Sequence, residues 1–163
     1  MSGPPQFASY ASAQMPVLVR SARAVTGDAE LADDVLQAVL ERVCRAWPRI
    51  GAMERRDAYI RRMLVNEFLD HTRHRRRVVP LAEVGTERTA PDTMAARDTR
   101  SDLLERITLL PPRQAVAIGL RYYGELSDPE IAEAMGCTAG TVRGYLSRAL
   151  ATLRAGFGAA LTV

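Results

Sequence analysis

Arginines and small residues alternate near the start of the last helix-forming segment, in a pattern suited to contacts with nucleic acid. Arg143 and Arg148 fall on the polar side of this segment, beside Gly140 and Gly144. A guanidinium is a planar fork of donors that matches phosphate oxygens and guanine edges, and glycine permits close approach of a backbone. The alternative is an ordinary helical hairpin with a solvated arginine face. We predict that DNA contacts Thr138, Gly140, Thr141, Arg143, Gly144, Ser147 and Arg148.

A second polar stripe lies in the helix expected over residues 57–77. Arginines and one asparagine recur there at spacings that bring them together on one side of a helix. This stripe suits a strand of phosphates beside exposed bases, and Asn66 is interpreted either as a reader of a base edge or as an ordinary surface residue. The run at 75–77 is either part of the contact or a solvated end favoured by the helix dipole. The predicted contacts are Arg62, Asn66, Arg73, Arg75, Arg76 and Arg77.

A third polar surface is expected in the helix over residues 28–47. Asp33, Asp34 and Gln37 lie opposite the apolar positions of that helix, which recur every four residues. Acidic groups on an exposed face suit a basic partner surface. The other interpretation is a capped and solvated helix face.

Residues of the kind that carry out catalysis are not arranged in any familiar constellation. The sequence holds no glycine-rich phosphate loop, nucleophile elbow or paired acids, so we expect no enzyme activity and no cofactor. His71 and His74 lie one turn apart, but a histidine pair alone is usually not a metal site. Cys44 and Cys137 form no CxxC pair, and we expect them to be buried in a reducing compartment.

The composition is that of a folded protein of one domain or two small ones. The chain has 163 residues and a formal net charge of +3, and its basic residues are all arginine, which also fits a GC-rich genome. Its start has no basic segment followed by a long apolar run, and no stretch approaches the length of a membrane span. We expect a cytoplasmic protein with no membrane contact.

The elements that position these residues are predicted to be helices throughout. We expect helices over residues 7–25, where Pro16 either kinks the helix or starts its main part, then over 28–47, ended by Pro48, and over 57–77. Residues 79–97 carry prolines, a glycine and acidic side chains, and we interpret them as a flexible linker. Helices resume over 98–110 and from Pro111 to about residue 123. The prediction is an all-α chain with domains at 1–78 and 98–163.

The segment over residues 127–154 has the signals of a helix-turn-helix. Ser127 and Glu130 can form a capping box with a proline in the first turn, Gly136 suits a left-handed helix end, and Thr138 caps the second helix. Cys137 is expected to pack inward. The inner side of the second helix is predicted from Val142, Leu146, Ala149, Leu150 and Leu153. Trp47, in the first half, fits a core position better than a DNA wedge.

These motifs together resemble extracytoplasmic-function (ECF) sigma factors, and the actinobacterial SigE-like subgroup most closely. The segment EIAEAMGCTAGTVR at 130–143, with LSRALATLR at 146–154 and the lead-in LPPRQ at 110–114, resembles region 4. LADDVLQ at 31–37 resembles region 2.2. WPRI at 47–50, AYIRRMLVN at 58–66 and RHRRR at 73–77 resemble regions 2.3 and 2.4. The resemblance covers about residues 15–77 and 98–155.

The resemblance implies a function and its partners. Region 4 would recognise the promoter −35 element and bind the β flap of core RNA polymerase, and region 2 would recognise and melt the −10 element. The β′ clamp helices would bind Asp33, Asp34, Leu36 and Gln37. The polymerase supplies the chemistry. Members of this class are often held by an anti-sigma protein, and the sequence leaves open whether this chain has one.

The chain departs from the family pattern in two places. Gly144 stands where serine is usual, and Tyr145 where arginine is common, so a contact to DNA is in doubt there. Residues 68–72, FLDHT, replace aromatics that are common before the arginine cluster, which leaves open how unpaired bases are held.

Two further matters stay open at the level of sequence. By its resemblance to the family, the linker threads through the polymerase near the RNA exit path; the alternative is a passive spacer. A separate hypothesis is that, in the free chain, the linker lets the two domains pack together and hide DNA-binding surface. One alternative function is a helix-turn-helix regulator that binds DNA alone as a dimer; in that case the first half would have no role beyond dimerisation. The other is an enzyme that modifies RNA or DNA.

Overall fold

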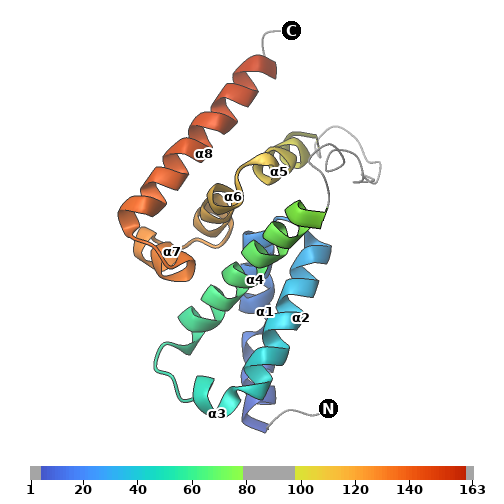
Figure 1. Ribbon diagram of the computed structural model, residues 1–163, viewed down its shortest axis with the longest axis vertical. Coiled ribbons are helices and arrows are strands. Elements are labelled where there is room, and N and C mark those ends of the chain that lie inside the picture. Colours follow the sequence, from blue (N-terminus) through green and yellow to red (C-terminus); the bar gives the residue numbers. More distant parts are fainter. Residues whose placement is uncertain (1–4, 79–97, 161–163) are drawn as a thin grey trace.

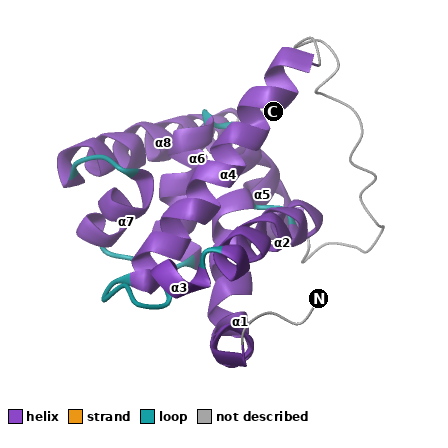
Figure 2. Cartoon of the chain, turned by 60° about the horizontal axis from the view of Figure 1, so that its bottom comes forward, coloured by secondary structure: helices purple, strands orange, loops and turns teal. Residues whose placement is uncertain are grey.

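The computed structural model describes residues 5–78 and 98–160, and within these ranges the chain is helical without any β-strand (Figures 1 and 2). The predicted all-α fold is confirmed. The expected linker at 79–97 lies outside the described residues. The helices are α1 Pro5–Thr26, α2 Ala29–Arg45, α3 Trp47–Ile50, α4 Arg56–Val78, α5 Asp98–Leu109, α6 Pro112–Ile118, the π-helix η1 Gly119–Tyr123, α7 Asp128–Met135 and α8 Ala139–Ala160.

The helix boundaries agree with the sequence signals except at two prolines. Asp28 caps α2, since its Oδ1 accepts hydrogen bonds from the backbone of Glu30 and Leu31 at 2.9 and 3.0 Å. Pro48 was expected to stop this helix, but α2 ends at Arg45 and Pro48 lies in the first turn of α3. Proline is favoured in a first turn because the N–H that it lacks has no helical partner there. Helix α1 begins at Pro5 and continues through Pro16, so Pro16 does not start it.

Helices α1, α2 and α4 pack against one another, and their apolar faces form most of the core of the first half. Trp47 is 6% exposed and closes one end of this bundle, with its ring centroid 5.5 Å from that of Phe7 and 5.0 Å from that of Tyr10. The prediction that Trp47 is a core residue is confirmed. The Tyr10 hydroxyl donates a hydrogen bond of 2.6 Å to Asp57, which ties α1 to the start of α4.

The helices that follow residue 97 pack directly onto this bundle. Helix α7 packs against α4 (Figure 1). Helix α6 and η1 pack against α1. One continuous cluster of buried side chains therefore contains Leu64 of α4 together with Val116, Ile131 and Met135 from the second half. Burial of apolar surface between the two halves stabilises this arrangement in proportion to the area removed from water.

Ion pairs at the edge of this contact join the same two halves. The Arg55 Nη2 atom lies 2.6 Å from Glu133 Oε2 of α7, and the Arg20 Nη2 atom of α1 lies 3.5 Å from Glu125 Oε2. Both pairs are largely exposed, so each adds little free energy to the apolar contact.

Candidate nucleic-acid interface

The turn between α7 and α8 is built by the capping signals that the sequence predicts. The backbone N–H of Ser127 donates to Glu130 Oε2 at 2.8 Å, and Glu130 N–H donates back to Ser127 Oγ at 3.4 Å, so the capping box is confirmed. Gly136 ends α7 with a φ of +65°, a conformation that is costly for residues with a Cβ. The Thr138 hydroxyl accepts from Thr141 N–H at 3.1 Å and caps α8.

Helix α8 divides into the two sides that were predicted. Val142, Ala149 and Leu153 are buried, and Leu146 and Leu150 are half-buried against the neighbouring helices. On the other side, Thr138, Gly140, Arg143, Ser147 and Arg148 are exposed, and Thr141 and Gly144 are half-buried. At 3.6 residues per turn, the predicted contacts from Gly140 to Arg148 share one side of the first turns of α8. The structure thus brings these residues together on an accessible surface, which we call the α8 face.

Both arginines of the α8 face contact other side chains of the chain. Arg143 Nη1 lies 3.7 Å from Oδ2 of Asp128 at the start of α7, and the same carboxylate pairs with Arg121 of η1. The Arg148 guanidinium lies over the Tyr145 ring, 5.6 Å from its centroid. Sequence reasoning missed Asp128 and Arg121 as neighbours of this site, because the packing of α7 against η1 and α8 leaves no local signal in the sequence.

The stripe on α4 is exposed along its whole length. Ile60, Leu64 and Phe68 are buried on the opposite side, as predicted. Arg62, Asn66, Arg73 and Arg77 fall within one narrow stripe at 3.6 residues per turn, whereas Arg75 falls on the other side of the helix and Arg76 beside the stripe. We call Arg62, Asn66, Arg73 and Arg77 the α4 stripe.

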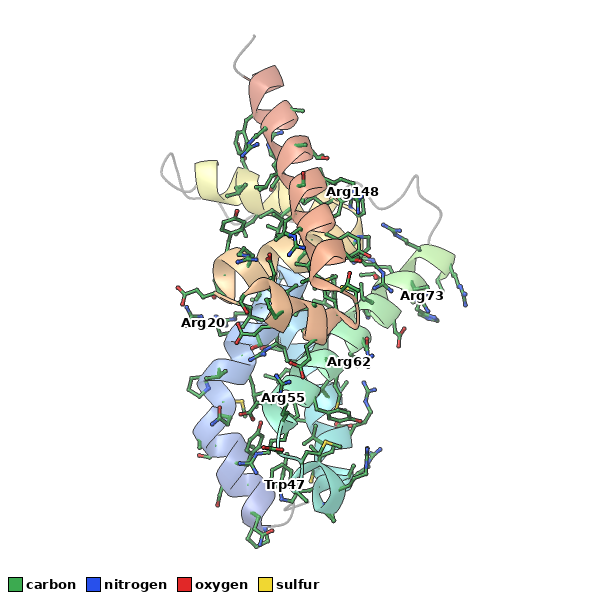
Figure 3. The ribbon with its side chains drawn as sticks, turned by 90° about the vertical axis from the view of Figure 1, so that its left-hand side faces the viewer. Arg20, Trp47, Arg55, Arg62, Arg73 and Arg148 are labelled. Atoms are coloured by element: carbon green, nitrogen blue, oxygen red, sulfur yellow. The ribbon has the colours of Figure 1, made fainter. Side chains whose placement is uncertain are left out.

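The two ends of the α4 stripe have different surroundings. Arg62 lies against the turn of the helix-turn-helix, since a Cβ added to Gly136 would stand 2.9 Å from Arg62 Nη2. Arg73 lies near the C-terminal end of α4, where its Nη1 atom is 3.7 Å from Oδ1 of Asp70 in the same helix. Figure 3 shows Arg62 and Arg73 on α4 and Arg148 on α8. The stripe therefore begins at the junction of the two halves and runs away from it.

The polar surface on α2 is present but lacks one of its predicted members. Asp33, Asp34 and Gln37 are exposed. Leu36 is only 6% exposed and belongs to the core, so its side chain does not reach this surface. Successive residues of a helix are rotated by about 100° about its axis, so Leu36 points toward the bundle although the next residue, Gln37, is exposed. The exposed residues Asp33, Asp34 and Gln37 form what we call the α2 acidic face.

Titratable groups near the site serve the fold rather than chemistry. The pKa of Glu130 is held below its usual value, first because the backbone N–H of Ser127 donates to its carboxylate and then because the Ser127 hydroxyl does so too. Burial raises the pKa of the Cys137 thiol, which packs inward against the core as predicted but is only half-buried, where full burial was expected. Cys44 is half-buried as well and, like Cys137, carries a free thiol.

The described part of the chain has neither a cluster of metal-ligating side chains nor a membrane-spanning helix. Across residues 5–78 and 102–158, no three His, Cys, Asp or Glu side chains are grouped so that they could hold a metal ion. No helix in the described part of the chain is both long and apolar enough to span a membrane.

Comparison with known proteins identifies both halves of the chain. Residues 11–78 match the family described as Sigma-70 region 2, and residues 100–153 match Sigma-70, region 4. The RNA polymerase sigma-E factors of Streptomyces avermitilis and Streptomyces coelicolor are each 35% identical over 153 residues. The alignments cover 91% of this chain and 83% and 84% of those proteins.

Solved structures share the fold. The sigma factor RpoE of Bartonella quintana, crystallised with the anti-sigma factor NepR, superposes with a TM-score of 0.67 at 24% identity, over 93% of this chain and 96% of that one. CnrH, solved with the cytosolic domain of CnrY, gives 0.62 at 22% identity, over 94% and 88%. The matches to regions 2 and 4, in this order and with the sigma-E factors as relatives, show that the chain belongs to the ECF sigma factors, which are not enzymes but bind core RNA polymerase and promoter DNA to initiate transcription.

Proposed function

We propose that the α8 face contacts the promoter −35 element and that the α4 stripe contacts the −10 element. The observation that carries the first assignment is the exposure of Arg143 and Arg148 on the first turns of the second helix of a helix-turn-helix. The N-terminal part of such a helix enters the major groove, where guanidinium groups bind guanine edges or flanking phosphates.

The α4 stripe supports a contact of a different kind. Its arginines can follow a phosphate backbone, and Asn66 among them can bind the edge of an unpaired base. Positive charge accounts for affinity at such a surface, whereas an amide contributes base preference. Arg75 does not share the stripe, so we assign it to the general positive potential at the end of α4.

The α2 acidic face is the proposed contact with the β′ clamp helices of the polymerase. Asp33 and Asp34 offer carboxylates and Gln37 an amide, all on one exposed surface. Because Leu36 is buried, it supports this surface from below rather than contacting the partner. The β flap is assigned to the second half on the family resemblance alone.

The free chain is proposed to adopt the packed arrangement, in which the shared core fixes the distance between the α8 face and the α4 stripe. The predicted DNA contacts are all at least partly exposed in this arrangement. The hypothesis that packing of the halves buries these residues is therefore not supported. The fixed distance between the α8 face and the α4 stripe can still differ from the distance between the −35 and −10 elements of a promoter. Binding of each half to a different part of the polymerase would change this distance.

An anti-sigma protein is a proposed partner, because two proteins with the same fold were solved with NepR and with the cytosolic domain of CnrY. The proposed location is the cytoplasm, where core RNA polymerase works.

The test is run-off transcription with purified core polymerase and the full chain on genomic fragments. Arg143→Ala and Arg148→Ala should each lower transcription and protection of the upstream promoter element. Arg154→Ala is the matched control, since Arg154 is an exposed arginine later on α8. Equal transcription by all three variants and the parent chain would show that the α8 face is misassigned.

A further inference from the structure

We propose that Asp128 and Tyr145 are positioning residues that aim the two arginines of the α8 face and so set the base preference at the −35 element. The inference rests on the proposed role of that face. Tyr145 and its neighbour Gly144 are positions at which the chain departs from the family pattern.

Asp128 is placed to act on Arg143 from outside the helix. Its carboxylate is 25% exposed and is paired through Oδ1 with Arg121, which holds it in place. The other carboxylate oxygen, Oδ2, lies 3.7 Å from Arg143 Nη1. This distance is within the range of an ion pair but longer than a hydrogen bond, so Asp128 biases the direction of Arg143 without fixing it.

Tyr145 and Gly144 act on Arg148 from within the helix. The Arg148 guanidinium carbon is 5.6 Å from the centroid of the Tyr145 ring, a distance at which the ring face attracts a cation. A Cβ added to Gly144 would lie 3.5 Å from Arg148 Nη2, so the guanidinium crosses the backbone at Gly144. Side chains three and four residues apart lie on one helix face and lean toward the N-terminus. Arg148 is therefore directed toward the end of α8 that would enter the groove.

The orientation of a guanidinium group matters more for recognising a base than for binding a phosphate. A guanidinium binds guanine through two donors to O6 and N7, which requires one orientation, whereas a phosphate accepts donors over a wide range of angles. An arginine held in place by a neighbour also loses less freedom on binding. Loss of either positioning residue should therefore relax base preference while leaving most of the phosphate contact intact.

The experiment measures competition among −35 elements for the holoenzyme of core polymerase and the full chain. The DNA is a promoter fragment identified by run-off transcription, with single base-pair changes in its −35 element. The variants are Asp128→Asn, Tyr145→Leu and Tyr145→Phe. Asp128→Asn and Tyr145→Leu should lower the ratio of affinities for the best and the altered elements by about threefold, the size expected for an exposed ion pair or a cation–π contact. Tyr145→Phe keeps the ring and should keep the ratio.

The salt dependence of binding is the readout that separates positioning from loss of charge. Its slope reports the number of phosphates neutralised, and it should be the same in all three variants and the parent chain. Thermal unfolding checks that each variant is folded. If Asp128→Asn does not fold, Arg121→Gln is used in its place. Arg121→Gln releases the Asp128 carboxylate and should likewise lower the ratio of affinities for the best and the altered −35 elements.

The outcomes distinguish this inference from the proposed function. If Arg143→Ala and Arg148→Ala abolish the −35 preference but Asp128→Asn and Tyr145→Leu retain the full ratio, the positioning role is wrong and the α8 face stands. If Arg143→Ala and Arg148→Ala also leave the preference unchanged, the assignment of the face itself fails.

Discussion

Gly119 of η1 and Ala24 of α1 are in backbone contact across the junction of the two halves. A Cβ added to Gly119 would stand 1.8 Å from the carbonyl oxygen of Ala24, far inside the distance that two non-bonded atoms can hold. The residue has a φ of −60°, so glycine is required here for space and not for its backbone freedom. This close approach of regions 2 and 4 therefore depends on the absence of one side chain.

Gly119→Ala should force the two halves apart. The methyl group meets backbone rather than a flexible side chain, and such overpacking costs about 1–3 kcal/mol, partly offset by the better helix propensity of alanine. We expect a lower unfolding midpoint and a larger radius of gyration by small-angle scattering. Gly158→Ala is the matched control, because a Cβ there would meet nothing within 4 Å and should stabilise the chain slightly. Identical shifts in both variants would argue against a tight contact at Gly119.

The Arg55–Glu133 ion pair should contribute little to the packed arrangement. The two atoms are 2.6 Å apart, but the Arg55 side chain is 71% exposed, so water and salt screen the attraction. A double-mutant cycle of Arg55→Ala and Glu133→Ala, followed by urea unfolding, should give a coupling energy below about 1 kcal/mol. A coupling above about 2 kcal/mol would mean that the ion pair, and not the apolar contact of α4 with α7, holds the halves together.

The capping box of α7 should make the helix-turn-helix sensitive to acid. The folded pKa of Glu130 is lowered below its unfolded value, so its stabilising effect is complete above the unfolded pKa and is lost as pH falls through the folded pKa. Glu130→Gln should therefore be less stable than the parent chain at neutral pH, and the two should converge in strong acid. Thermal unfolding followed by circular dichroism between pH 7 and pH 2 measures this.

The partner residue of the box provides an independent check. Ser127→Ala removes the hydroxyl that accepts from Glu130 N–H, and loss of such a cap costs about 1 kcal/mol. This loss should persist in acid better than the loss in Glu130→Gln, because the hydroxyl does not titrate. A difference between Glu130→Gln and the parent chain that stays constant down to pH 2 would contradict the role given to the carboxylate.

Asp34→Ala should weaken association with core polymerase. Asp34 is exposed on the α2 acidic face, and loss of one charge-assisted contact of about 1.4 kcal/mol lowers affinity about tenfold. Titration of core polymerase with labelled chain measures the change. Glu54→Ala is the control, since Glu54 is an exposed acid in the turn before α4. Equal affinities for both variants and the parent chain would remove the α2 acidic face from the polymerase contact.

The features that the sequence predicted correctly depend on neighbours in the chain. The capping box of Ser127 and Glu130, the left-handed Gly136 and the two sides of α8 follow from spacings of three or four residues, which helix geometry converts into faces. The same periodicity separated the exposed Asp33 and Asp34 from the apolar side of α2. Local signals of this kind, together with the order of the motifs, were enough to recognise the family.

The remaining features depend on residues that are distant in sequence. Arg55 and Glu133 are separated by 78 positions, and no local pattern indicates that α7 packs along α4 or that Gly119 meets Ala24. The placement of Asp128 beside Arg143 likewise needed the packed helices. Periodicity shows which side of a helix is apolar, but only the fit of side chains between helices decides which faces meet, because burial is non-directional and many pairings remove similar areas from water.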